Sequence, residues 1–161
     1  MTIRSAGLLL YRRGATGTTA GQDLEVWIAH MGGPFWARKD EHAWSVPKGE
    51  YLEDEDPLVA AKREFAEEIG TGAPAVDYFP LGTFRQPSSK LITVFSAETD
   101  FRPEQIVSNT FELEWPKGSG VVRSYPEIDD AVWTSESVAR TKLVKGQIPI
   151  LDALVQHLTS G

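Results

Sequence analysis

The sequence predicts a mixed α/β fold, in which helices cover a mixed β-sheet. Short apolar runs of strand-like composition lie on both sides of a central segment whose apolar residues recur at helical spacing, and two further helical patterns close the chain. The length of 161 residues suits one domain with a substantial core. We therefore expect a single domain over residues 1–161.

The first part of the chain predicts two paired strands and two loops. Residues 5–11 and 24–30 are apolar enough for buried strands. The Gly- and Thr-rich residues 12–23 between them predict a mobile hairpin loop, and residues 31–42, with two glycines and a proline, predict another loop. Residues 44–49 (WSVPKG) predict a short extended segment that leads toward the central helix.

The central helix is predicted between Asp56 and Gly70. Asp56 can cap its N-terminus, Pro57 suits its first turn, and Gly70 is a common stop. Apolar residues recur at helical spacing between these signals and form one stripe. They are Leu58, Ala61, Phe65 and Ile69.

Residues beyond the central helix predict further strands. Residues 78–85 and 91–99 have the composition of strands. Residues 110–115 (TFELEW) alternate between apolar and acidic side chains, so a strand there would carry Glu112 and Glu114 on its polar face.

The last part of the chain predicts one short strand and two helices. Residues 131–133 predict the strand, and residues 135–145 and 149–159 predict the helices. The second helix has a continuous apolar face, which predicts that it packs on the core.

Composition excludes several classes of function. The net charge of −7 argues against binding to long nucleic acid, which needs a basic face, but it leaves room for a small phosphorylated partner. The chain has no cysteine, which excludes disulfides and thiolate chemistry. The N-terminal apolar run of about five residues is too short for a signal peptide or a membrane span. We expect a cytoplasmic protein without a membrane partner, and we leave a homodimer open.

Three glutamates of the central helix share one face. Glu64, Glu67 and Glu68 are spaced i, i+3 and i+4, so their charges repel one another. A divalent cation such as Mg²⁺ would relieve this repulsion, because hard cations take carboxylate oxygens and are often shared with substrate phosphates. The alternative is a solvated acidic helix face.

Residues 49–71 (GEYLEDEDPLVAAKREFAEEIGT) match the pattern G-x5-E-x7-R-E-φ-x-E-E-x-G-φ, in which φ is a bulky apolar residue. The stretch resembles the Nudix box, the signature of hydrolases that cleave nucleoside diphosphates linked to another group. One position departs from the pattern, because Thr71 stands where the family usually has an aliphatic residue. We expect Thr71 to pack at the helix end, away from the chemistry.

The resemblance covers roughly residues 2–158. It implies the Nudix α-β-α sandwich, with a mixed β-sheet and the box forming a loop-helix-loop. Residues 108–116 (SNTFELEWP) resemble an uncharacterised bacterial subgroup of predicted nucleotide pyrophosphohydrolases.

The family pattern also implies roles for the box residues, with Mg²⁺ as cofactor and Mn²⁺ as a substitute. The Gly49 carbonyl would complete the metal shell, and Arg63 would pair with a box carboxylate in a geometry that Glu55 supports. The alternative for Arg63 is an ordinary surface ion pair. The implied metal ligands are the carboxylates of Glu64, Glu67 and Glu68.

Many Nudix enzymes use another acid from outside the box. Glu112 and Glu114 are the first candidates for such a metal-binding acid, because their strand face is polar. Glu127 is the second choice. An exposed strand face without a role in the chemistry is the alternative for these residues.

Aromatic and basic residues before the box are candidates for substrate binding, since aromatic rings stack on bases and Lys or Arg bind phosphate oxygens. These candidates are Trp36, Arg38, Lys39, Trp44 and Lys48. Trp44 could equally be a core residue. Lys48 is better placed than the others, because it adjoins Gly49 and because its Pro-Lys-Gly setting resembles diadenosine and inositol polyphosphate hydrolases.

Together these features predict a metal-dependent hydrolase that cleaves a P–O–P bond in a dinucleoside polyphosphate or a nucleoside triphosphate. An ADP-ribose-like sugar nucleotide is the alternative substrate, and Pro87, 16 residues past Thr71, is its one supporting feature. A non-catalytic nucleotide sensor is a further alternative. The intact Glu64, Glu67 and Glu68 argue against a sensor.

Overall fold

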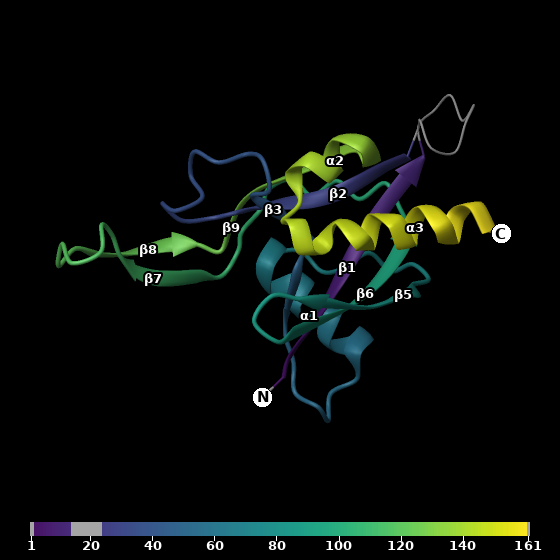
Figure 1. Ribbon diagram of the computed structural model, residues 1–161, viewed down its shortest axis with the longest axis horizontal. Helices are drawn as coiled ribbons and strands as arrows, with labels where there is room; N and C mark the ends of the chain where they lie inside the picture. The colour runs from purple at the N-terminus through teal and green to yellow at the C-terminus, as the bar shows by residue number, and fades with distance from the viewer. Residues whose placement is uncertain (1, 14–23, 161) are drawn as a thin grey trace.

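The two predicted N-terminal strands form an antiparallel pair. This is seen in a computed structural model that describes residues 2–13 and 24–160 (Figure 1). Strand β1 (Ile3–Arg13) pairs with β2 (Leu24–Met31), so the predicted pairing is confirmed. The loop predicted over residues 12–23 lies almost entirely outside the described residues.

One half of the main sheet is built around β1. It runs parallel to β6 (Lys90–Glu98) and antiparallel to β4 (Lys48–Glu50), and β5 (Phe79–Gln86) pairs antiparallel with β6. This mixture of parallel and antiparallel pairs confirms the predicted mixed sheet. Strand β4 brings the start of the predicted box against the N-terminal half of β1, with Ala6 opposite Gly49.

The other half of the sheet is built around β2. It pairs antiparallel with β3 (Trp44–Ser45) and with β9 (Ile128–Ser135). Only residues 131–133 predict this last strand in the sequence, because the acidic start of β9 has no apolar alternation. Backbone pairing along the whole of β2 extends the strand at both ends.

Helices cover both faces of the sheet, as an α-β-α sandwich requires. Alternate residues of β1 point to opposite faces. Leu8 packs with Phe65 of α1 (Pro57–Ile69) on one face, and Leu9 packs with Leu151 of α3 (Ile148–Ser160) on the other. None of the helices in residues 2–13 and 24–160 is both long enough and apolar enough to span a membrane.

The predicted boundaries of α1 are confirmed. The Asp56 side chain accepts a hydrogen bond from the Val59 N–H at 3.1 Å, and Gly70 ends the helix with a φ of 84°. The apolar stripe faces the sheet, with Phe65 and Ile69 fully buried.

A two-stranded ribbon stands apart from the main sheet, at the left of Figure 1. Its first strand, β7 (Thr110–Glu114), is the one that the sequence predicts. Its partner β8 (Val122–Pro126) is not predicted, because its apolar and polar residues do not alternate and Pro126 argues against a strand.

The first of the closing helices is shorter than predicted. Helix α2 (Glu136–Lys142) begins after Ser135, whose side chain caps Val138. The chain leaves the helix at Leu143, which forms an isolated bridge with Trp44. Contact with β3 therefore ends a helix that the sequence extends to residue 145.

Candidate active site

The carboxylates of α1 face the short strand β4. Glu68 Oε1 accepts the Lys48 N–H at 3.0 Å. The Glu64 carboxylate lies directly over Gly49, because a Cβ atom built at position 49 would be only 1.9 Å from Glu64 Oε2. Any side chain at position 49 would displace this carboxylate. Gly49 thus makes room for the Glu64 carboxylate of α1.

Arg63 ties the loop before α1 to the helix. Its Nη1 donates to Glu64 Oε1 at 2.7 Å, and its Nη2 lies 3.1 and 3.0 Å from the two carboxylate oxygens of Glu55. Glu67 is the outermost partner, at 3.8 Å. Exposed ion pairs contribute little to stability, so their main effect here is on the orientation of Glu64.

Burial raises the pKa of two box carboxyls. It raises the pKa of Glu64, although the hydrogen bond from Arg63 opposes the shift. It raises the pKa of Glu68 to about 7, against the opposing hydrogen bond from the Lys48 amide and the charge of Lys48. A bound cation beside Glu64 and Glu68 would stabilise their ionised forms, which burial disfavours.

Among the candidate acids outside the box, Glu127 is the one whose charge acts on the box carboxyls. Its charge raises the pKa of both Glu64 and Glu68, so it lies close to them. A chain of backbone hydrogen bonds places it there: Asn109 N–H donates to Glu67 O at 3.1 Å, and Glu127 N–H donates to Asn109 O at 2.9 Å. Glu127 O then accepts the Gly32 N–H at 2.8 Å.

Glu112 and Glu114, the first candidates for this acid, lie instead on the β7–β8 ribbon (Figure 1). The Glu114 carboxylate accepts the Gly118 N–H at 2.7 Å, inside the turn of the ribbon. This placement favours Glu127 over Glu112 and Glu114 as the candidate metal-binding acid outside the box. Alternation identified the polar face of β7, but it could not show that the ribbon leaves the main sheet.

The donor set fits a hard divalent cation. The donors are carboxylate oxygens and the Gly49 carbonyl, which are the ligands that Mg²⁺ and Mn²⁺ prefer. Within residues 2–13 and 24–160, no three acidic or histidine side chains are already arranged as a metal site. Arg63 and the Lys48 amide hold oxygens of Glu64 and Glu68, so metal binding would exchange these contacts for the ion.

Among the substrate candidates, Lys48 lies nearest to the carboxylates. Its backbone N–H binds Glu68, and its ammonium is close enough to oppose the rise in the Glu68 pKa. Lys39 lies in the loop between β2 and β3, with its Nζ 3.4 Å above the ring of Phe35 and 5.5 Å from that of Trp36. Arg38 is exposed in the same loop.

Trp44 is a core residue in this structure. Its side chain is buried in the cluster under α3, and its Nε1 donates to Asp40 Oδ1 at 2.9 Å. The ring therefore has no free face on which a base could stack. The core interpretation of Trp44 is favoured over its role as a substrate contact.

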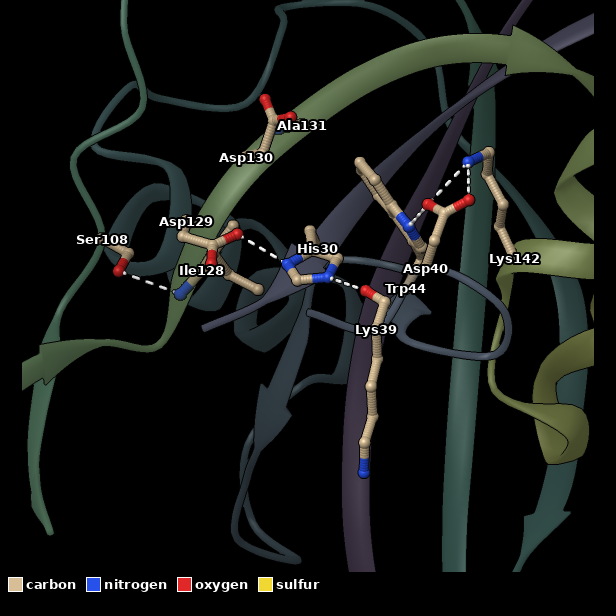
Figure 2. Close-up of polar contacts among 10 residues, drawn as sticks. All are labelled: His30, Lys39, Asp40, Trp44, Ser108, Ile128, Asp129, Asp130, Ala131 and Lys142. Atoms are coloured by element: carbon tan, nitrogen blue, oxygen red, sulfur yellow. Dashed lines mark hydrogen bonds and ion pairs between the residues drawn. The ribbon is translucent and has the colours of Figure 1, made fainter. Parts of the chain in front are cut away.

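His30 and Asp129 are two polar residues near the site that sequence reasoning missed. They are hydrogen-bonded to each other across β2 and β9 (Figure 2). His30 stands at no motif spacing from other candidate site residues, so the sequence gives no signal for it. Its hydrogen bond to Asp129 joins residues 99 positions apart.

The raised pKa of Glu68 predicts how the stability of the metal-free protein depends on pH. The folded value of about 7 exceeds the ordinary value of 4.5, so folding favours the protonated carboxyl. The stability from this group is complete below about pH 4.5 and is lost as pH rises through 7, by about 3 kcal/mol in total. Urea unfolding in chelator should show this loss in wild type and not in Glu68→Gln. Equal pH slopes for the two proteins would contradict it.

Comparison with known families and structures agrees with the fold and with the box. The profile of the NUDIX domain matches residues 3–154. No curated protein matches the chain at a significant level.

Solved structures match the fold over almost the whole chain. The C. elegans Ap4A hydrolase in a binary complex is 18% identical, with a TM-score of 0.63 over 99% of this chain and 100% of that one. The NUDIX domain of Shewanella oneidensis NrtR, complexed with ADP ribose, is 15% identical, with a TM-score of 0.60 over 98% and 89%. The MutT protein from Methanosarcina mazei Go1 is 15% identical, with a TM-score of 0.59 over 99% and 96%.

Proposed function

This chain belongs to the Nudix family, and we propose that it is a pyrophosphohydrolase that cleaves a P–O–P bond in a dinucleoside polyphosphate or a nucleoside triphosphate. One observation carries the choice of substrate. The charge of Lys48 lies close to Glu68, so a phosphate chain held at the box carboxylates would reach this ammonium. A longer phosphate chain gains more from such a contact than a diphosphate does.

The chain's own residues divide the chemistry between them. Glu64, Glu67, Glu68 and Glu127 would hold Mg²⁺ or Mn²⁺, which supplies a Lewis acid and lowers the pKa of bound water. Arg63 holds Glu64 in orientation, and Lys48 binds a phosphate oxygen. A carboxylate of the cluster accepts the proton of the attacking water. The new P–O bond forms in line with the bridging P–O bond that breaks, and the bridging oxygen leaves with the second phosphorylated product.

An ADP-ribose-like sugar nucleotide is the second candidate substrate. The neighbour complexed with ADP ribose and the position of Pro87 favour it. A third candidate, a nucleotide sensor without catalysis, is opposed by the complete set of box carboxylates.

A screen of nucleotides with Mg²⁺, read by mass spectrometry, tests the proposal. The panel contains diadenosine polyphosphates, nucleoside triphosphates and ADP-ribose, and the product masses identify the bond that breaks. We expect the fastest turnover with a substrate that has three or more phosphates. A clear preference for ADP-ribose would support the second candidate, and binding without turnover of any nucleotide would support the sensor.

Replacing Lys48 with Ala should weaken the use of long polyphosphates most. A lost charge-assisted contact costs about 1.5–3 kcal/mol when it is desolvated and much less when it is exposed. We expect kcat/KM to fall by roughly 10-fold or more for diadenosine tetraphosphate and by less for ADP-ribose. Lys62→Ala is the control, because Lys62 lies on α1, outside β4, and its Nζ lies 5.2 Å from the ring of Tyr78. An equal fall for all substrates would argue against the polyphosphate assignment.

Replacing Glu127 with Gln should lower kcat by about 10-fold, because it removes a charge that faces Glu64 and Glu68. Glu112→Gln and Glu114→Gln make the same chemical change on the ribbon and should stay within about 3-fold of wild type. Steady-state kinetics at saturating metal measures all three. A larger loss in Glu112→Gln or Glu114→Gln would restore the first choice made from the sequence.

A further inference from the structure

His30 lies at the end of β2 and joins two segments that border the candidate site. The side chain is 9% exposed. Its Nδ1 is 2.7 Å from Asp129 Oδ1 of β9, and its Nε2 is 2.6 Å from the Lys39 carbonyl oxygen in the loop between β2 and β3 (Figure 2). The imidazole ring therefore connects β9, through Nδ1, to the loop between β2 and β3, through Nε2.

Both partners of His30 accept hydrogen bonds. A carbonyl oxygen has no proton to donate, and an ionised carboxylate has none either. Nε2 must then donate to the Lys39 carbonyl oxygen, and the Asp129 carboxylate lies within hydrogen-bond distance of Nδ1. At a buried site the loss of either hydrogen bond leaves its partner unsatisfied.

A bulge in the sheet aims Asp129 at the ring. In the pairing of β2 with β9, His30 lies opposite Asp130, but Met31 lies opposite Ile128. Asp129 is the extra residue between these pairs, and a bulge redirects the side chain of the residue that it inserts. Asp129 is also only two residues beyond Glu127, so the bond holds the strand that begins beside Glu127.

The loop is fixed on its other side by Asp40. The Asp40 carboxylate accepts the Trp44 Nε1–H at 2.9 Å and lies 2.7 and 2.8 Å from Lys142 Nζ of α2. The peptide of Lys39 is thus held by His30 on one side, and its neighbour is held by α2 on the other (Figure 2). The same loop presents the Lys39 ammonium over the ring of Phe35.

We infer that His30 is a positioning residue, which with Asp129 holds loop residues 33–42 against β9 so that the aromatic and basic side chains of the loop meet the substrate. The inference rests on the proposed function, in which Trp36, Arg38 and Lys39 bind the substrate. Loss of the pairing releases the loop and weakens substrate binding more than it slows the chemical step.

Three variants test the inference: His30→Gln, Asp129→Asn and the control Asp130→Asn. Asp130→Asn makes the same charge change one residue away, and among the described residues the Asp130 carboxylate accepts a hydrogen bond only from the neighbouring Ala131 N–H. We expect KM to rise by about 10-fold in His30→Gln and by at least about 3-fold in Asp129→Asn, with kcat within about 3-fold of wild type, because ground-state contacts are lost. Asp130→Asn should keep the wild-type KM.

Hydrogen exchange of the loop gives a readout that needs no substrate. The amides of Trp36 and Lys39 are bonded within the loop, to Gly33 O and Trp36 O. They should exchange about 10-fold faster in His30→Gln and at least about 3-fold faster in Asp129→Asn, while amides of α1 keep their wild-type rates.

The two readouts separate the inference from the proposed function. Faster loop exchange without hydrolysis of any nucleotide would retain the role of His30 in holding the loop and reject the substrate assignment. Loop exchange and KM in Asp129→Asn equal to those of Asp130→Asn would overturn the inference. Asp129→Asn decides alone if His30→Gln does not fold.

Discussion

Replacing Glu68 with Gln should lower kcat by at least ~10²-fold, equivalent to about 2.7 kcal/mol of transition-state stabilisation. The amide keeps the shape of the side chain and can still accept the Lys48 N–H, which lies 3.0 Å from Glu68 Oε1. It lacks the negative charge that a divalent cation needs at this place. The same loss is expected for Glu67→Gln. Steady-state kinetics at saturating Mg²⁺ and substrate measures both.

Folding should survive both changes. Glu68→Gln removes a partly buried carboxyl whose pKa is raised to about 7, so the metal-free variant should be at least as stable as wild type at neutral pH. Glu53→Gln is the matched control, because Glu53 is an exposed acid of the loop before α1. Near-normal turnover in Glu67→Gln or Glu68→Gln would remove that residue from the metal site.

Removing divalent cations with EDTA should abolish hydrolysis, and adding Mg²⁺ or Mn²⁺ should restore it. Nudix hydrolases generally need divalent metal ions, and burial raises the pKa of Glu64 and Glu68 here. Without an ion, these carboxylates and the phosphates of a substrate would repel each other. Turnover measured over a titration of free Mg²⁺ gives the apparent metal affinity.

Two controls separate loss of metal from loss of fold. The unfolding transition in EDTA should remain cooperative at neutral pH, because the apolar packing of Phe65 and Leu8 does not involve the metal. Ca²⁺ prefers a larger and more flexible ligand shell, so it should restore less activity than Mg²⁺. Full activity in excess chelator would reject the metal-dependent mechanism.

Features that depend on near neighbours in the chain were predictable. The start of α1 at Asp56, its stop at Gly70 and its buried stripe follow from capping and from helical spacing, and the structure has all three. The strand assignments of β1, β2, β5, β6 and β7 were also correct, since each has a local apolar pattern. Strand β8 has no such pattern and was missed.

Features that depend on contacts between distant residues were not predictable. Glu127 approaches Glu64 only because the backbone around Asn109 links the end of α1 to the start of β9. Trp44 has the composition of a base-stacking residue, but the packing of α2 and α3 buries it. A side chain's burial and its distant partners depend on the whole fold.

The box residues therefore identify the family and the class of chemistry from the sequence alone, because helical spacing and a glycine at a fixed offset bring Glu64, Glu67, Glu68 and Gly49 together. Only the tertiary structure places Glu127 beside them and makes His30 the link between a strand and a loop. Spacing along one helix determines which of its side chains share a face. His30 and Asp129 are 99 positions apart, and they meet only because β2 pairs with β9 and the sheet bulges between these strands.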